Sequence, residues 1–92
     1  MIKASFGITW PFGLGSRSGS LLAHTASRYK CKVTVSKDGL VVEGKSLMGL
    51  MLLAAETGSE ISVIVDGEDE KKAMAAILHL FADKFYSEGW SD

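Results

Sequence analysis

Three short segments in which apolar and polar side chains alternate restrict the fold of this chain more than any other feature of its sequence. They cover residues 5–10, 31–36 and 60–65. A period of two places successive side chains on opposite faces of a β-strand, so each segment is expected to form a half-buried strand. Lys37-Asp38-Gly39 is typical of a hairpin turn, because Gly39 can adopt a positive φ. Residues 40–43 are therefore expected to form a further strand, paired with residues 31–36.

Apolar residues between these strands recur at helical spacing. Leu22, Ala26 and Tyr29 predict a helix that begins near residues 16–18 and ends near Lys30. A second, short helix is expected over residues 47–54. Ser46 stands where its hydroxyl can cap that helix.

A longer third helix is predicted near the end of the chain. Acidic residues at 66–70 complement the dipole at its amino end. Its buried stripe is expected to contain Met74, Ile77, Phe81 and Phe85. The order β-α-β-β-α-β-α predicts an α+β open-faced sandwich, a largely antiparallel sheet of four strands with helices on one face.

Composition limits the domain organisation and the class of function. With 92 residues, 47% of them apolar, the chain is expected to form a single domain over residues 1–92. The net charge of −1 argues against a surface that binds nucleic acid through phosphate contacts. Residues 4–16 form the longest uncharged stretch, but they contain Gly and Pro and are too short to span a bilayer. We expect a soluble cytoplasmic protein without a signal peptide or membrane contact.

Cysteine and histidine usage offers no metal site. The single cysteine, Cys31, cannot form an internal disulfide, and no pattern of Cys and His residues matches a zinc site. Cys31 is expected to act as a small buried apolar residue. We expect neither a metal nor a cofactor.

Three motifs resemble those of one known family. They are Gly13-Leu14-Gly15-Ser16-Arg17-Ser18-Gly19, Gly44-Lys45-Ser46-Leu47-Met48-Gly49-Leu50-Met51 and Gly67-Glu68-Asp69-Glu70. Together they resemble the HPr family, the histidine-containing phosphocarrier proteins of the bacterial sugar phosphotransferase system. The likeness runs from about Lys3 to Phe85, and residues 86–92 form a C-terminal extension that departs from the family's usual end. The resemblance implies a four-stranded antiparallel sheet covered on one face by three helices.

One position departs from the family pattern in a way that bears on chemistry. The resemblance implies that a histidine in the first motif accepts a phosphoryl group from enzyme I, and Gly15 occupies that position here. Glycine offers no nucleophile, so phosphohistidine chemistry is expected to be absent and the protein is not expected to be an enzyme. Ser18 replaces a proline of the pattern and Gly19 an alanine, so we expect a less constrained first helical turn.

Neither histidine of the chain is expected to replace the missing one. His24 lies nine positions beyond Gly15, which on a helix is more than roughly ten ångströms away. His79 falls inside the third predicted helix. Both are expected to be ordinary solvated or packed helix residues.

Ser16 and Arg17 form a candidate anion-binding site at the start of the first helix. Amide groups there carry the positive end of the dipole, and the Arg17 guanidinium can bind phosphate oxygens. The resemblance implies that an arginine at this position steadies the phosphohistidine. The alternatives are that Arg17 is an ordinary exposed arginine and that Ser16 and Ser18 only cap the helix.

Ser46 is a candidate site of regulatory phosphorylation. The resemblance implies that, in Gram-positive relatives, a serine kinase modifies the serine at this position and the product binds a transcriptional regulator of catabolite control. A phosphate there would change the charge of a docking face. The alternative is that Ser46 only caps the short helix.

The short helix carries more apolar residues than its buried side can accommodate. Leu50 and Leu53 are expected to point inward, which leaves Leu47, Met48 and Met51 as an exposed patch. The resemblance implies a protein-docking surface composed of Arg17, Ser20, Leu47, Met48 and Met51. The alternative is that these apolar residues belong to the core.

Three functions remain open at this point. The first is a regulatory or adaptor protein of the phosphotransferase system, similar to the Crh branch of the family, which also lacks the histidine. The second is a phosphocarrier in which Gly15 is an engineered or variant change. The third is an α+β module that binds an anionic metabolite at Ser16 and Arg17. The expected partners are phosphotransferase-system proteins and a serine kinase or transcriptional regulator, without direct contact to nucleic acid.

Overall fold

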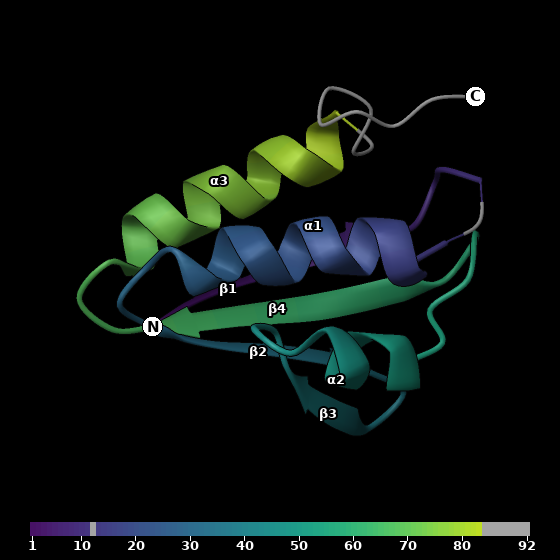
Figure 1. The fold of residues 1–92 in the computed structure, drawn as a ribbon, viewed down its shortest axis with the longest axis horizontal. Helices are drawn as coiled ribbons and strands as arrows, with labels where there is room; N and C mark the ends of the chain where they lie inside the picture. Colours follow the sequence, from purple (N-terminus) through teal and green to yellow (C-terminus); the bar gives the residue numbers. More distant parts are fainter. Residues whose placement is uncertain (12, 84–92) are drawn as a thin grey trace.

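The computed structural model describes residues 1–11 and 13–83 and contains the predicted order of elements (Figure 1). The strands are β1 (Ile2–Gly7), β2 (Lys32–Lys37), β3 (Leu40–Glu43) and β4 (Glu60–Asp66). The helices are α1 (Ser16–Ser27), α2 (Leu47–Leu52) and α3 (Glu70–Ala82). The predicted order β-α-β-β-α-β-α is confirmed.

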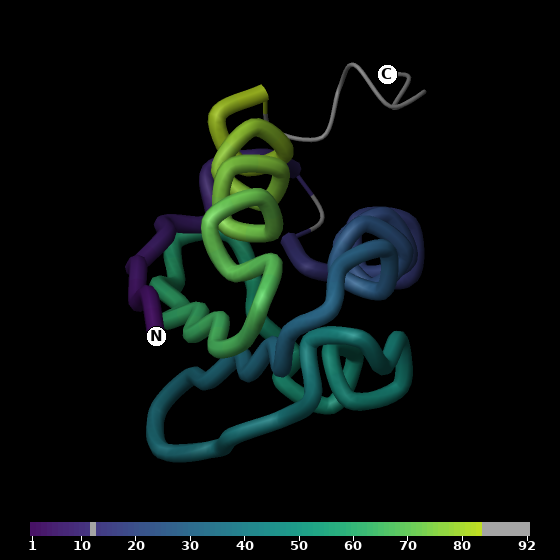
Figure 2. The backbone as a smooth tube through the Cα atoms, turned by 90° about the vertical axis from the view of Figure 1, so that its left-hand side faces the viewer, coloured from purple at the N-terminus to yellow at the C-terminus, as the bar shows by residue number. Residues whose placement is uncertain are grey.

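The strands form one antiparallel sheet in the order β1-β4-β2-β3. In β1, β2 and β4 the burial alternates along the strand: one parity is buried in β4, buried at Val33 and Val35 in β2, and half-buried or buried in β1, as expected when one face is covered. Figure 2 shows that α3, α1 and α2 all lie on the same side of the sheet. The fold is the α+β sandwich that the periodicity and the resemblance predict.

The core lies between the sheet and the helices. Val33, Val63 and Val65 from the sheet are fully buried against Leu22 of α1 and Ile77 of α3. A group of aromatic residues fills the end of the core near the loop before α1: the Phe6 and Phe81 rings stack at 4.2 Å, and Trp10 meets Phe81 edge-on at 5.6 Å. The expected burial of Met74, Ile77 and Phe81 in α3 is confirmed, whereas Phe85 and residues 86–92 lie outside the described residues.

The first predicted strand is displaced by three residues. Alternation placed it at residues 5–10, but β1 ends at Gly7, where its last partner in β4 is Glu60. Ile8 then bonds to the loop before β4. Its amide donates to Ser59 O at 2.9 Å, and its carbonyl oxygen accepts from the Gly58 amide at 2.8 Å. Ile8 and Trp10 are therefore buried outside a strand, and their burial produced the misleading pattern.

The first two helices end earlier than predicted. After Ser27, the amides of Arg28 and Tyr29 bond to carbonyls three residues back, so the α-helix closes in a tighter turn before Lys30. The short helix ends at Leu52 rather than at residue 54, because Ala54 adopts a left-handed conformation (φ 49°) that no α-helix continues through. Within residues 1–11 and 13–83, no helix is long and apolar enough to cross a bilayer.

Candidate functional site

The loop before α1 depends on Gly13. Its φ is +61°, and a Cβ atom there would lie 2.5 Å from the carbonyl oxygen of Ala55. The neighbouring Leu14 amide donates to that same oxygen at 2.8 Å. Only glycine permits this close approach, which fixes the loop against the segment after α2.

Ser18 joins the loop to the first turn of α1. The side chain is only 1% exposed, its hydroxyl donates to Gly13 O (3.0 Å), and it accepts from the Gly15 amide (3.1 Å). The Trp10 indole N–H donates to the same Gly13 oxygen at 2.6 Å. The expectation of a less constrained first turn is therefore wrong, because hydrogen bonds of Ser18 replace the fixed φ of proline.

Gly15 is the N-cap residue of α1. Its φ of −100° and ψ of −153° are extended values that any L-residue adopts, so the backbone does not require glycine here. Gly15 has no side chain with which to cap the helix. The side-chain hydrogen bond at this end instead comes from Ser18, three residues later, whose hydroxyl accepts from the Gly15 amide. The expected capping role thus belongs to Ser18, while Ser16 lies exposed at the first helical position.

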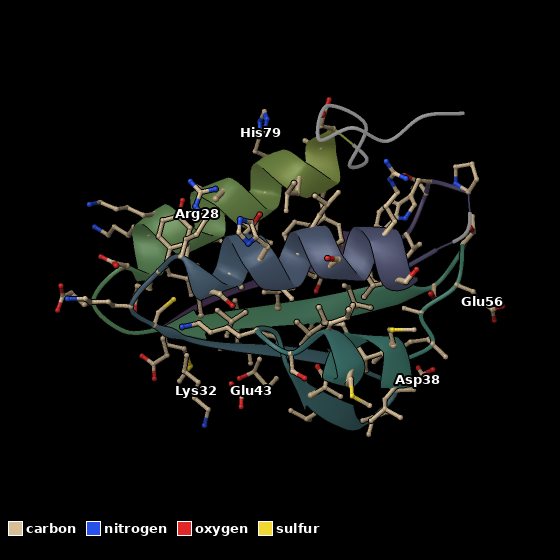
Figure 3. The ribbon with its side chains drawn as sticks, in the orientation of Figure 1. Arg28, Lys32, Asp38, Glu43, Glu56 and His79 are labelled. Carbon is tan, nitrogen blue, oxygen red and sulfur yellow. The ribbon has the colours of Figure 1, made fainter. Side chains whose placement is uncertain are left out.

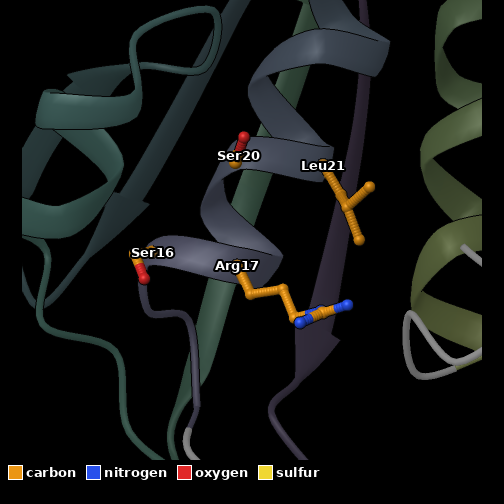
Figure 4. A pocket seen from close by; sticks show the side chains of 4 residues that line it. All are labelled: Ser16, Arg17, Ser20 and Leu21. Atoms are coloured by element: carbon orange, nitrogen blue, oxygen red, sulfur yellow. The ribbon is translucent and has the colours of Figure 1, made fainter. Parts of the chain in front are cut away.

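Ser16 and Arg17 lie together at the amino end of α1, as the sequence predicts. With Ser20 and Leu21 they line a surface hollow of about 350 Å³ (Figure 4). Arg17 and Leu21 lie on the side of α1 that faces α3, and Ser16 and Ser20 lie on the side nearer α2. The positive end of the helix dipole and the Arg17 guanidinium give this hollow a chemistry suited to anions.

The second part of the site is the exposed side of α2. Leu50 and Leu53 are 0% and 4% exposed, which confirms their predicted inward orientation. Met48 and Met51 are 77% and 48% exposed, as predicted, and Leu47 is half-buried. Leu52 is 72% exposed and was missed. Its spacing of four from Met48 could have revealed it, because such residues share one side of a helix.

We call Leu47, Met48, Met51 and Leu52 the α2 patch. The patch adjoins α1 because Gly19 has no side chain: a Cβ at Gly19 would lie 3.2 Å from Leu47 Cδ1 and 3.8 Å from Leu50 Cβ. Ser20, the exposed residue after Gly19, therefore lies beside the α2 patch. The fold thus brings Ser20 of α1 next to the predicted docking residues of α2, whereas Arg17 lies on the side of α1 that faces α3.

Ser46 caps α2 as predicted. Its hydroxyl oxygen accepts a hydrogen bond from the Gly49 amide at 3.1 Å, and its carbonyl accepts from the Leu50 amide at 3.0 Å. The neighbouring Lys45 ammonium donates to the Tyr29 carbonyl oxygen at 2.8 Å, at the carboxyl end of α1. Lys45 therefore joins the segment before α2 to the end of α1.

The remaining candidate side chains are the two histidines and Cys31. His24 and His79 are exposed residues of α1 and α3, and Figure 3 shows His79 on the outer side of α3. His79 and Arg28 border a hollow of about 180 Å³ between α1 and α3. Cys31 is half-buried rather than fully buried, and desolvation raises the pKa of its thiol, which disfavours the reactive thiolate.

Comparison with known proteins identifies the family of this fold and surface. The family described as "PTS HPr component phosphorylation site" matches residues 2–83. The chain belongs to the HPr family. It is 41% identical to the phosphocarrier protein HPr of Xylella fastidiosa (strain Temecula1) over 85 residues, which cover 92% of this chain and 96% of that one. Membership of the HPr family implies interaction with proteins of the phosphotransferase system.

Both branches of the HPr family are among its relatives. The HPr-like protein Crh of Bacillus subtilis is 39% identical over 74 residues, covering 80% of this chain and 87% of its own. The crystal structure of HPr-C-His from Thermoanaerobacter tengcongensis superposes with a TM-score of 0.89 at 33% identity, covering 92% of this chain and 96% of the other. Identity alone therefore does not separate a phosphocarrier from a Crh-like regulator.

Proposed function

We propose that this HPr-family protein is a regulatory or adaptor component of the phosphotransferase system that acts by binding partners and carries no phosphohistidine. The proposal rests on Gly15, because the resemblance of the first motif implies that this residue takes the position of the phosphoryl-accepting histidine. The motif residues around it, Gly13, Leu14 and Arg17, support this assignment. In-line phosphoryl transfer requires a side-chain nucleophile, and Gly15 has none.

The geometry of α1 supports the loss of the carrier reaction. His24 is nine residues beyond Gly15, a rise of roughly 13 Å along a helix. It is exposed at the far end of α1 rather than at the hollow lined by Ser16 and Arg17. A donor protein that docks on the first turn of α1 would find no imidazole within reach among the described residues.

The proposed binding surface combines the hollow at α1 with the α2 patch. Arg17 and Ser20 contribute polar contacts, and Leu47, Met48 and Met51 contribute apolar area. Exposed methionines adapt to differently shaped partners, which suits an adaptor that binds more than one protein. The Ser16-Arg17 hollow would receive an anionic side chain or phosphate of the partner.

Ser46 is proposed as the regulatory site of this surface. It lies at the start of α2, next to Leu47, so a phosphate on its hydroxyl would add about −1.5 to −2 charges beside the α2 patch. The Lys45 ammonium bonds to Tyr29 O and therefore stabilises the α1–α2 junction in the unmodified protein. Phosphorylation of Ser46 by a serine kinase would thus change which partner, including a transcriptional regulator, binds the surface.

The test is phosphorylation by the HPr serine kinase with ATP, followed by intact-mass measurement. We expect the wild-type chain and Ser27→Ala, a control on the exposed side of α1, to gain one phosphate. Ser46→Ala should gain none. Met48→Ser with Met51→Ser should weaken binding of the modified protein to the regulator without preventing modification. A Ser46→Ala protein that gains the same mass as the wild type would contradict the proposal.

A further inference from the structure

The face of the sheet opposite the helices is uncovered among the described residues. We call it the open face. Ten of its side chains come from alternate positions of the four strands: Lys3 and Ser5 of β1, Ser62, Ile64 and Asp66 of β4, Lys32, Thr34 and Ser36 of β2, and Val41 and Glu43 of β3. All are half-buried or exposed. Figure 3 shows Lys32 and Glu43 pointing away from α1 and α3.

Strand register arranges opposite charges at the two edges of the open face. One row of paired residues crosses the whole sheet: Lys3, Ile64, Thr34 and Glu43. Lys3 on edge strand β1 and Glu43 on edge strand β3 therefore stand at opposite ends of the same row. Both side chains are exposed, and roughly three strand spacings of about 4.8 Å separate their backbones, which is too far for an ion pair within one chain.

The two central strands carry a second pair of opposite charges, which are direct neighbours in the register, and the Asp66 carboxylate also lies 3.7 Å from the Met1 ammonium group. Asp66 of β4 pairs with Lys32 of β2 in the register, one row away from the Lys3–Glu43 row on this face. Both side chains are exposed. These four residues place one acid and one base on each side of the line midway between β4 and β2, and the exposed Glu60 of β4 adds a second acid on the β1–β4 side.

This arrangement is complementary to itself. A two-fold axis that runs along the strands, midway between β4 and β2, lays β1 of one copy over β3 of the other and β4 over β2. Lys3 then meets Glu43 of the second copy and Asp66 meets Lys32 of the second copy, each contact occurring twice. We propose that the open face binds a second copy of this chain in a two-fold symmetric, face-to-face dimer.

The shape of the open face agrees with this pairing. A hollow of about 240 Å³ lies on β2 and β3, lined by Lys32, Thr34, Val41, Val42 and Glu43. The same two-fold axis places the half-buried side chain of Ile64 of the second copy above Thr34, at the wall of this hollow. The apolar projection on β4 therefore meets the recess on β2 and β3.

The size of the open face predicts a weak dimer. Four strands about 4.8 Å apart and about six residues long give roughly 350–400 Å² of sheet per copy, below the area of a stable interface. At one end of the sheet the axis brings the exposed Glu60 near Asp38 of the second copy, which limits affinity further. We expect dissociation constants in the high-micromolar to millimolar range and rapid exchange. The dimer leaves α1 and α2 of both copies exposed for partners, so it does not depend on the proposed function.

The test uses two charge-reversed chains and sedimentation equilibrium at millimolar protein. In a homodimer of Lys3→Glu, both contacts between residues 3 and 43 join two carboxylates, and in a homodimer of Glu43→Lys both join two ammonium groups. Each variant by itself should therefore self-associate at least about tenfold more weakly than the wild type. Mixed in equal amounts, the two chains should form a heterodimer, because both of its contacts join opposite charges. In one contact the two introduced side chains meet, and in the other the unchanged Lys3 meets the unchanged Glu43. The double variant Lys3→Glu with Glu43→Lys should regain wild-type self-association.

Matched controls carry the same charge changes elsewhere. Lys71→Glu on α3 and Glu56→Lys in the loop after α2 are both exposed, and each should self-associate as the wild type does. In dilution series followed by amide chemical shifts, Ile64 and Thr34 should move and α1 should not. A wild type that stays monomeric, a Lys3→Glu chain that associates like the wild type, or control chains that pair as strongly as the reversed chains would overturn the proposal.

Discussion

The hydroxyl of Ser18 donates a hydrogen bond to the carbonyl oxygen of Gly13 at 3.0 Å, from the first turn of α1 to the loop before it. Because the same hydroxyl accepts from the Gly15 amide at 3.1 Å, one side chain fixes the backbone on both sides of Leu14. The loop and the helix therefore act as one unit. This unit positions Gly15 and the hollow lined by Ser16 and Arg17.

Ser18→Ala should destabilise the fold by about 1–2 kcal/mol, because the half-buried Gly15 amide loses its side-chain partner and the Gly13 oxygen keeps only the Trp10 indole N–H of its two side-chain donors. Urea unfolding measures the change. Ser16→Ala is the control, since Ser16 is exposed, and it should change the free energy of unfolding by less than about 0.5 kcal/mol. Equal effects from the two variants would show that the Ser18 hydrogen bonds contribute nothing to stability.

Gly13→Ala should be among the most damaging small substitutions in the chain. It combines a left-handed φ of +61° with a Cβ position 2.5 Å from Ala55 O. Gly58→Ala separates the two effects, because Gly58 has a φ of +97° but nothing within 4 Å of its Cβ position. Gly58→Ala should cost about 1–2 kcal/mol, and Gly13→Ala at least about 1 kcal/mol more. Similar losses in thermal unfolding would contradict the close approach to Ala55.

Gly19→Ala should stabilise the protein by about 0.5–1 kcal/mol through the lower backbone entropy of alanine in a helix. The new methyl group would lie 3.2 Å from Leu47 Cδ1, and the half-buried Leu47 side chain can shift to make room. Gly19→Val is the matched control, because its branched side chain cannot fit beside Leu50 and should destabilise the junction of α1 and α2. Urea unfolding measures both, and a destabilised Gly19→Ala would show that α2 cannot move.

Stability should depend on pH through Glu70. A hydrogen bond from the Gly67 amide and contact with the Met1 ammonium group hold the pKa of the Glu70 carboxyl below its ordinary value of 4.5. A carboxyl with a lowered folded-state pKa stabilises the fold above its unfolded pKa, and that contribution disappears as the pH falls through the folded value. Glu70→Gln should therefore lose less stability than the wild type between about pH 5 and pH 3.

Contact with Glu70 also raises the pKa of the Met1 ammonium group above 8.0, so its contribution is present below pH 8 and is lost as the pH rises through the raised value. Glu68→Gln, which removes an exposed carboxyl two residues away, serves as the control for both the acidic and the alkaline part of the stability profile. Thermal unfolding across the pH range measures them. Identical profiles for Glu70→Gln and Glu68→Gln would contradict the assignment to Glu70.

Local patterns in the sequence predicted elements but not the contacts between them. Alternation in residues 60–65 located β4 because that strand is buried on one face only, whereas Ile8 and Trp10 imitated a strand because the loop turns them into the core. Ser46 was predictable as a cap because its partner, Gly49, is three residues away. The bond from Lys45 to Tyr29 O joins residues 16 positions apart and has no local signal.

In the candidate site, too, local spacing predicted some features, whereas contacts between distant segments were not predictable. Helical spacing sufficed to place Met48 and Met51 on an exposed side and Leu50 inside. The capping role of Ser18 was among the alternatives, but its bond to Gly13 was not predictable, because it depends on the carbonyl of Gly13 being turned toward the helix by a left-handed residue. The charge pattern of the open face emerges only from the pairing of β1, β4, β2 and β3, which brings Lys3 and Glu43 into one row.

Phosphoryl acceptance from enzyme I tests the central claim most directly. The full-length chain is incubated with enzyme I and phosphoenolpyruvate, and its intact mass is measured under conditions that preserve acid-labile phosphate. We expect no added phosphate on the wild type, and one on Gly15→His, whose backbone angles suit a histidine. An acid-labile phosphate on the wild-type chain would contradict the account.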